Sequence, residues 1–251
     1  MTAYFYVTLV LLAIILIFTL FKRNSTLKKI ALDLQLGGII YGGLVAVYSL
    51  LLAFVVVIVW QQYQVTGDRI ESEASKLLNI YRSSYAFKDT SSARIRRAVV
   101  NYVESVKNDE WYALEHDSLS TKTQKVYDQL WHVVYEIKPF TEEEKIWYAS
   151  IVQNINQFGE ARHLRLSDRD ASIPPIMWYM LVAGATLIIL FSILLFSDNN
   201  FNHLLKVLMI STMIIFSLLL VYLLDHPFQG TLKIEPTAFE KINILDKMDL
   251  K

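Results

Sequence analysis

The sequence predicts an all-α integral membrane protein with four transmembrane helices and an antiparallel helical extramembrane bundle inserted between the second and third spans. Three observations support this fold class. Uncharged apolar runs long enough to cross a bilayer occur towards both ends of the chain, and a polar stretch of helical periodicity separates them. Apolar residues make up 54% of the 251 residues, and the mean hydropathy is +0.35, which is typical of a membrane protein.

Four regions follow from the positions of the apolar segments. Residues 1–64 hold the first two spans with a basic amphipathic connection, and residues 65–173 form the helical extramembrane bundle. Residues 174–226 hold the third and fourth spans, and residues 227–251 form a C-terminal tail. Amphipathic helices joined by short connections are typical of antiparallel bundles.

The first predicted span runs from Tyr4 to Phe21 without a charged residue. The residues before it lack the basic region of a secretory signal, so we expect a retained anchor. The segment KRNSTLKKIALDLQL follows, and it mixes basic with apolar residues. Two interpretations stay open for it: an amphipathic segment lying along the headgroup surface, or an inter-helix loop with stop-transfer charges.

The second predicted span, Gly38 to Trp60, is the segment around which the other regions are arranged. It contains no charged residue, and at ~1.5 Å per residue it covers the ~30 Å hydrocarbon core of a bilayer. Its small residues share one face of the helical wheel, and small residues let helix backbones approach closely in lipid. This small-residue face predicts either helix packing or a pore wall, and it consists of Gly38, Gly42, Ala46, Ser49, Ala53, Val56 and Trp60.

The helical pattern continues beyond the membrane to about Phe87, with a bend expected at Gly67. At the standard rise, a helix of this length extends roughly 75 Å. The polar turn at residues 89–92 offers several N-cap residues for the next helix, which is expected to end near His116.

Two more bundle helices are marked by local signals. One begins at about Ser120 and is expected to stop at Lys138, because Pro139 disfavours a helical residue before it. Thr141 and Glu144 have the spacing of a capping box, which predicts the start of the last bundle helix.

Prolines mark the boundaries of the C-terminal membrane region. The pair at 174–175 suits the first turn of a helix, so the third span begins there and extends to about Phe196. The fourth span runs from about residue 204 to residue 224, and Pro227 follows its end. In the tail, the residues from Pro236 to Leu245 are predicted to form a short helix.

Charge and composition argue against several functional classes. Twenty-four basic and twenty-four acidic residues cancel, so no net field attracts nucleic acid. The chain has no cysteine, and its five histidines lack the spacing of a zinc motif. No nucleotide-binding or hydrolase motif occurs. We therefore expect no enzyme, and no catalytic, cofactor-binding or metal-binding residue.

Charged residues close to the spans are candidates for a vestibule or a pore mouth, namely Glu71, Glu73, Arg162, Arg165 and Asp225. The two glutamates would form acidic rings around a symmetry axis, or else be ordinary solvated charges. The two arginines either attract anions or pair with neighbouring acids at 160, 168 and 170. Asp225 ends a span, where a carboxylate lines a pathway, binds a partner or simply meets water.

One set of motifs covers nearly the whole chain, from about Gly37 to Gly230. It comprises GGIIYGG, FVVVIVWQQY, IESEASKLLNIYRS, RHLRL before PP-x-x-W, and the closing DHPFQG. With this layout the chain resembles the bacterial bestrophin-like membrane protein family, which is remotely similar to bestrophin channels. The resemblance implies a homo-oligomer with an axial pore, and it places Ser49, Ala53, Val56 and Trp60 toward the axis. It does not extend to a calcium clasp, because no EF-hand pattern or matching dense acidic loop is present.

These observations predict a homo-oligomeric, multi-pass ion channel of a bacterial inner membrane, whose partners are the lipid bilayer and small inorganic ions. The alternative is a structural or sensory membrane scaffold whose bundle binds a partner or ligand. The basic residues between the first two spans favour a bundle outside the cell. The resemblance instead implies a cytosolic bundle, so both orientations stay open.

Overall fold

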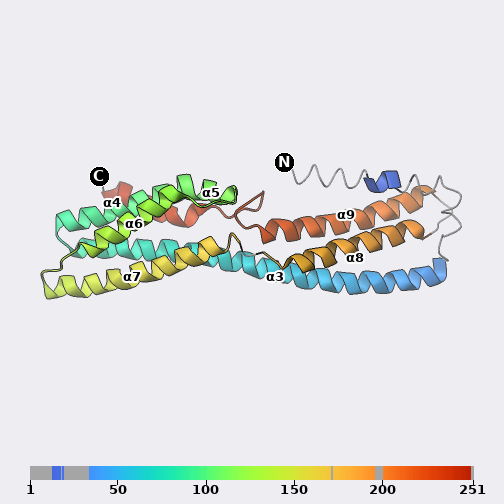
Figure 1. Cartoon of the computed structure of the whole chain (residues 1–251), viewed down its shortest axis with the longest axis horizontal. Helices are drawn as coiled ribbons and strands as arrows, with labels where there is room; N and C mark the ends of the chain where they lie inside the picture. The colour runs from blue at the N-terminus through green and yellow to red at the C-terminus, as the bar shows by residue number, and fades with distance from the viewer. Residues whose placement is uncertain (1–12, 18, 20–33, 171, 196–199, 250–251) are drawn as a thin grey trace. The chain divides into compact units, whose positions relative to one another are not determined.

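The computed structural model describes residues 13–17, 19, 34–170, 172–195 and 200–249 (Figure 1). These residues fold into helices joined by turns, which confirms the all-α prediction. The chain forms two compact units. The first comprises residues 1–60 with 173–224, and the second comprises residues 61–172 with 225–251.

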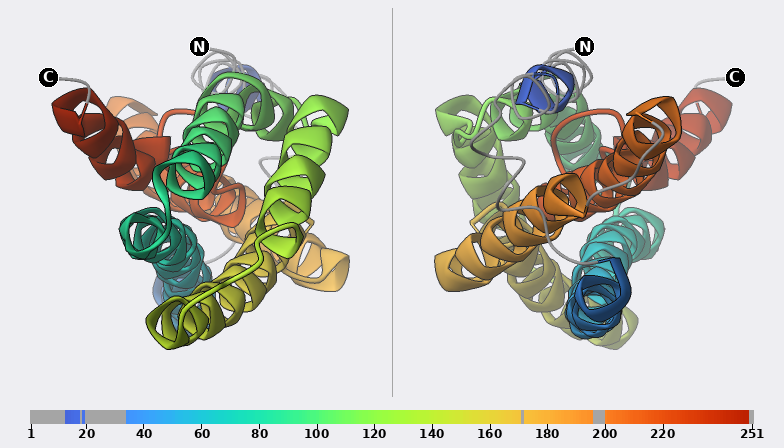
Figure 2. Two further views of the ribbon diagram at one scale, coloured as in Figure 1. Left: turned by 90° about the vertical axis from the view of Figure 1, so that its left-hand side faces the viewer. Right: turned by 90° about the vertical axis from the view of Figure 1, so that its right-hand side faces the viewer.

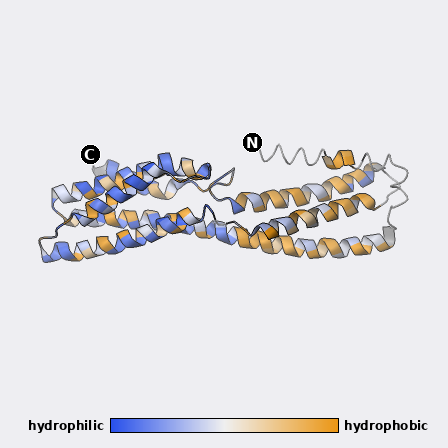
Figure 3. Cartoon of the chain, in the orientation of Figure 1, coloured by the Kyte–Doolittle hydropathy of each residue, from blue (hydrophilic) through white to orange (hydrophobic). Residues whose placement is uncertain are grey.

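Three helices among the described residues are long and apolar enough to cross a membrane. They are α3 (Leu34–Ser83), α8 (Pro175–Leu194) and α9 (Asn200–Asp225). Figure 3 shows the hydrophobic character of α8, α9 and the N-terminal half of α3. The predicted first span lies mostly outside the described residues. In its described part, Ile14 is buried against residues of α8 and α9, namely Ile193, Val207 and Ile215.

Helix α3 packs closely on α8 in the first unit. Tyr48 of α3 is buried with Ala185 and Ile188, and its hydroxyl donates to the carbonyl of Leu181 at 3.2 Å. A Cβ at Gly184 would lie 2.6 Å from the Tyr48 ring, so this crossing requires glycine. The close approach of two helices at a small residue is typical of packing in membranes.

The second unit is a helical bundle with one continuous hydrophobic core. It contains residues 61–83 of α3, then α4 (Asp89–Ser105), α5 (Trp111–Glu115), α6 (Thr121–Tyr135) and α7 (Glu142–Ser167). Helix α6 lies beside α4 (Figure 2). A π-helical turn, Val106–Glu110, separates α4 from α5, and a 3-10 turn, Ser84–Ala86, follows α3. The tail adds a 3-10 turn, Pro236–Phe239, and α10 (Glu240–Asp249).

Local signals placed several boundaries correctly. Thr141 and Glu144 form the predicted capping box, with the Glu144 amide donating to the Thr141 hydroxyl at 3.0 Å. Ser120 is the N-cap of α6, and α8 begins at Pro175. The predicted tail helix is also present, with Phe239 and other apolar residues buried in the bundle core.

Two local predictions are wrong, and the bend expected at Gly67 stays a prediction. Helix α3 is one unbroken α-helix through this glycine, which costs a helix interior only about 1 kcal/mol. Helix α4 begins at Asp89 itself, with Lys88 at the N-cap and no side-chain cap. Helix α6 ends at Tyr135 and not at Lys138, because the chain turns there to bury Ile137.

Candidate functional site

Most of the small-residue face of α3 is left exposed by the part of the chain that the structure describes. Gly42, Ala46, Ser49, Ala53 and Trp60 are exposed, while Gly38 and Val56 are half-buried. A Cβ added at either Gly38 or Gly42 would meet no atom within 4 Å. Among the described residues, Gly38 and Gly42 therefore take no part in a close helix crossing.

A different face of α3 is turned inward, and part of it contacts α8 and α9. Its members recur at three- and four-residue spacing, and they are Tyr41, Val45, Tyr48, Leu52, Val55 and Val59. At ~100° per residue, this buried face and the small-residue face are separated by roughly a quarter turn. Large apolar side chains such as Val47, Leu50 and Phe54 cover the remaining surface and are more than half exposed.

A network of buried charges occupies the core of the second unit. It joins Glu73 of α3, Tyr102 of α4, Glu110 of the π-helical turn, and both Arg162 and Arg165 of α7. The side chains of Glu73 and Arg165 are 0% exposed. The two carboxylates and two guanidinium groups cancel in charge. We call these five residues the buried charge network.

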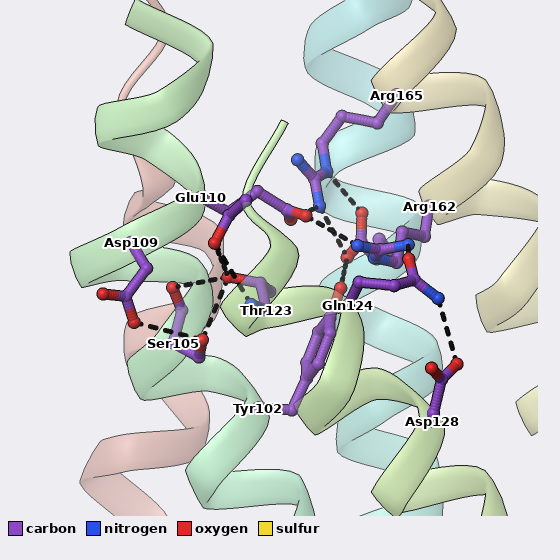
Figure 4. A network of polar contacts seen from close by, with 11 residues as sticks. Tyr102, Ser105, Asp109, Glu110, Thr123, Gln124, Asp128, Arg162 and Arg165 are labelled. Atoms are coloured by element: carbon purple, nitrogen blue, oxygen red, sulfur yellow. Dashed lines mark hydrogen bonds and ion pairs between the residues drawn. The ribbon is translucent and has the colours of Figure 1, made fainter. Parts of the chain in front are cut away.

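The arginines bridge the two glutamates with short, charge-assisted hydrogen bonds. Arg165 donates through Nε to Glu73 Oε2 at 2.5 Å and through Nη2 to Glu110 Oε2 at 2.5 Å. Arg162 Nη2 donates to Glu110 Oε1 at 2.7 Å, and the Tyr102 hydroxyl donates to Glu73 Oε1 at 2.6 Å. Figure 4 shows both guanidinium groups directed towards Glu110. Glu73 thus accepts from donors on α4 and α7, while Glu110 accepts from two arginines of α7.

The π-helical turn places Glu110 in this network. Tyr102 precedes Glu110 by about two helical turns. In a regular α-helix, the Glu110 side chain would point roughly 80° around the axis from that of Tyr102. A π-helical turn contains an additional residue, which rotates later positions back toward the Tyr102 direction. The Trp111 amide accordingly donates to the Val106 carbonyl, five residues earlier.

Electrostatics in the network follow from burial and from the facing charges. Burial, followed by the negative charges of Glu73 and Glu110, raises the pKa of Tyr102 well above its usual value. Burial opposes the charge on Arg165, but the same two carboxylates more than offset it and raise its pKa. Arg165 and Tyr102 therefore keep their protons, and the network suits structural cohesion better than proton transfer.

The structure separates the candidate charges of the sequence into two groups. Glu73, Arg162 and Arg165 are buried in the protomer, so they are not solvated charges. The arginines do not pair with the sequence-neighbouring acids. Asp168 instead binds Arg69 of α3.

The other two candidate charges lie elsewhere in the second unit. Glu71 is exposed on α3 and lines a surface groove with residues 234–241 of the tail. Asp225 is 5% exposed and accepts a hydrogen bond from the Ser172 hydroxyl at 2.7 Å. It is therefore a buried, hydrogen-bonded group at the end of α9.

The spacing of apolar residues in the sequence indicates that part of this network is buried. Glu73 lies three residues after Ile70 and four before Leu77, inside the apolar stripe of α3. Arg162 and Arg165 likewise continue the stripe of α7 that includes Phe158. A charge within an apolar stripe indicates a buried partner, although it does not say which one. Sequence reasoning missed Glu110, Tyr102 and the hydrogen bond from Arg162 to Gln124.

Comparison with known families decides the identity of this architecture. Over residues 4–239, the sequence matches the bestrophin-like domain. The chain belongs to the bestrophin-like family. This assignment makes it a membrane protein of an ion-channel family and gives no support to an enzyme. A comparison with curated proteins gives no match.

Solved structures show that this bestrophin-like chain has a known fold. A mutant of a bacterial bestrophin homolog from Klebsiella pneumoniae is similar over 99% of both chains, with a TM-score of 0.74 and 13% identity. A second mutant of that homolog covers 100% of both chains, with a TM-score of 0.71 and 12% identity. A membrane protein structure covers 97% of both chains at a TM-score of 0.73 and 14% identity. At these identities the likeness concerns the fold.

Proposed function

We propose that this bestrophin-like protein is a homo-oligomeric ion channel of a bacterial inner membrane. Several copies surround a common axis, and the small-residue face of α3 lines the pore. The part of α3 beyond Trp60 contributes to a vestibule, with exposed Glu71 as a candidate charge on its wall. Family membership supports conduction of ions. The observation that supports the arrangement is that the described residues leave most of this face uncovered.

The chemistry of α3 suits a pore that is gated by an apolar constriction. Residues 38–60 contain no charged side chain, and hydrophobic constrictions can close a pore by excluding water. Small side chains leave room for an axial opening and for contacts between neighbouring copies. A single protomer offers one such face, so conduction requires several copies.

The absence of native cysteine makes the arrangement directly testable. A cysteine introduced by Ser49→Cys lies on the small-residue face, and one introduced by Val47→Cys lies on the wheel roughly 140° away from the centre of that face. Both positions are exposed in the protomer. The matched pair therefore differs in direction while sharing helix and depth.

The experiment reconstitutes each variant into liposomes and measures ion flux before and after treatment with a charged, membrane-impermeant thiol reagent. We expect reagent to block flux through Ser49→Cys and to leave Val47→Cys conducting. Oxidative cross-linking should join copies through Ser49→Cys more readily. Liposomes that stay closed to every ion tested, or equal block of the two variants, would contradict the proposal.

A further inference from the structure

A surface groove of about 700 Å³ lies between α4 and α6 in the second unit. Small-molecule sites have volumes of roughly 300–1,000 Å³ and combine apolar walls with a few polar groups. Apolar side chains form much of this groove, including Ala93, Ala98, Val126 and Val133. Arg94, Arg97 and His132 are among its polar lining residues. Its size and lining fit a small organic molecule with an anionic group.

A carboxylate from the protein already occupies one end of this cationic cluster. Glu136 forms an ion pair with Arg94, and its Oε1 lies 3.4 Å from His132 Nδ1. The hydrogen bond from Arg94 lowers the pKa of Glu136 below its usual value. The Arg94 and Glu136 side chains are about half exposed, and ion pairs of this kind are weak enough to exchange partners.

Arg97 supplies a second guanidinium one helical turn along the same side of α4 as Arg94. It is exposed, and the described part of the chain provides it with no ion pair. The acidic residue of the lining, Asp128, instead accepts a hydrogen bond from Gln124 at 3.0 Å. A planar guanidinium binds a carboxylate through two parallel hydrogen bonds, which gives both affinity and orientation.

We propose that the groove binds a small organic carboxylate. Its carboxylate is held by Arg97, with Arg94 joining when Glu136 is displaced, and its apolar part lies against Ala98, Val126 and Val133. The guanidinium of Arg97 selects an anion, and the apolar walls select an organic one over an inorganic ion. The groove belongs to the second unit and the small-residue face to the first, so this proposal does not depend on the proposed pore.

Benzoate is a suitable probe, and benzamide is its neutral counterpart of the same shape. Binding to the full chain in nanodiscs can be measured by ligand-observed NMR at fixed ionic strength. We expect benzoate to bind and benzamide to bind at least tenfold more weakly, since a hydrogen bond between two charged groups is stronger than one to a neutral amide. Inorganic phosphate should not displace benzoate at equal concentration.

Variants make the assignment specific. Arg97→Gln should weaken benzoate binding about tenfold or more, and Glu136→Gln should strengthen it by releasing Arg94. Val133→Trp should abolish binding by filling the groove, while Arg82→Gln, an exposed arginine outside the groove, should leave it unchanged. Thermal unfolding of each variant verifies folding.

Three outcomes would overturn the proposal. Equal binding of benzoate and benzamide would show that charge plays no part. Benzoate affinity unchanged by Arg97→Gln would place the anion elsewhere. Gln129 also lines the groove, and efficient cross-linking between copies through Gln129→Cys would show that a second chain covers the groove.

Discussion

Replacement of Arg165 by methionine tests whether the buried charge network stabilises the bundle. Methionine has a similar length and no charge, so the change removes charge-assisted hydrogen bonds while roughly conserving volume. Arg165 makes contacts of 2.5 and 3.1 Å with Glu73 and of 2.5 Å with Glu110. After the change, the Tyr102 hydroxyl would be the remaining hydrogen-bond donor to Glu73 within the network. The cluster would carry a net charge of −1 in a water-excluded core.

The expected cost follows from leaving a buried charge unpaired. Breaking a buried ion pair by removing one partner destabilises a protein by about 3–5 kcal/mol. For a protein of this size, each kcal/mol lowers Tm by about 2–4 °C. The Arg165→Met variant should therefore unfold roughly 6–20 °C below the parent protein.

Thermal unfolding in detergent, followed by tryptophan fluorescence, measures this change. The matched control is Lys145→Met, which removes an exposed pair with Glu142 and should alter Tm by less than about 2 °C. The double variant Glu73→Gln with Arg165→Met restores neutrality and should recover part of the loss. An Arg165→Met protein that unfolds with the control, or a double variant that loses the sum of both single effects, would refute the reasoning.

Four further substitutions probe three separate features. Tyr102→Phe removes a 2.6 Å hydrogen bond to a carboxylate and should cost about 1.5–3 kcal/mol at pH 8 in thermal unfolding. The pKa of Tyr102 is raised in the folded state, so its contribution to folding stability is complete below the unfolded pKa of about 10 and decreases above it. Tyr102→Phe removes this dependence, and Tm should therefore fall less steeply at alkaline pH. Gly184→Ala drives a Cβ into the Tyr48 ring and should lower Tm, whereas Gly42→Ala meets no atom and should leave the protomer fold intact. Thr141→Ala removes a capping box and should cost about 1 kcal/mol by the same assay.

Helix boundaries were predictable because their causes are local in sequence. The capping box at Thr141 and Glu144 is formed by side chains three residues apart. Pro175 opens α8 because its fixed φ suits a first helical turn. The chain turns after α9 just before Pro227, as expected for a residue that cannot continue a helix.

The buried charge network was not predictable in full because its partners are distant in sequence. Glu73 and Arg165 are 92 residues apart, and Glu110 and Arg165 are 55 apart. Periodicity places Glu73 and Arg165 inside apolar stripes, but it cannot pair them. Glu110 is harder still, because its direction depends on a π-helical turn that a regular wheel misplaces.

Two neighbouring glutamates of α3 now receive opposite roles, which yields a last prediction. At ~100° per residue, positions 71 and 73 point roughly 160° apart, so one helix cannot present both to the same surface. Glu73 faces the core with Ile70 and Leu77, and its 0% exposure follows from this. Glu71 instead continues the direction of the small-residue face, and it is exposed.

If the small-residue face lines a pore, Glu71→Gln should shift the reversal potential in a salt gradient toward greater anion permeability, because an acidic ring at a pore mouth favours cations. The Tm of this variant should stay unchanged. Glu73→Gln should do the reverse, lowering Tm and leaving selectivity as it is, because its carboxylate is enclosed by Arg165 and Tyr102. Planar-bilayer recording and thermal unfolding of the same two preparations separate these outcomes. A selectivity change in Glu73→Gln alone would reverse the assignment, since it would require the buried face of α3, and not the uncovered one, to meet the ions.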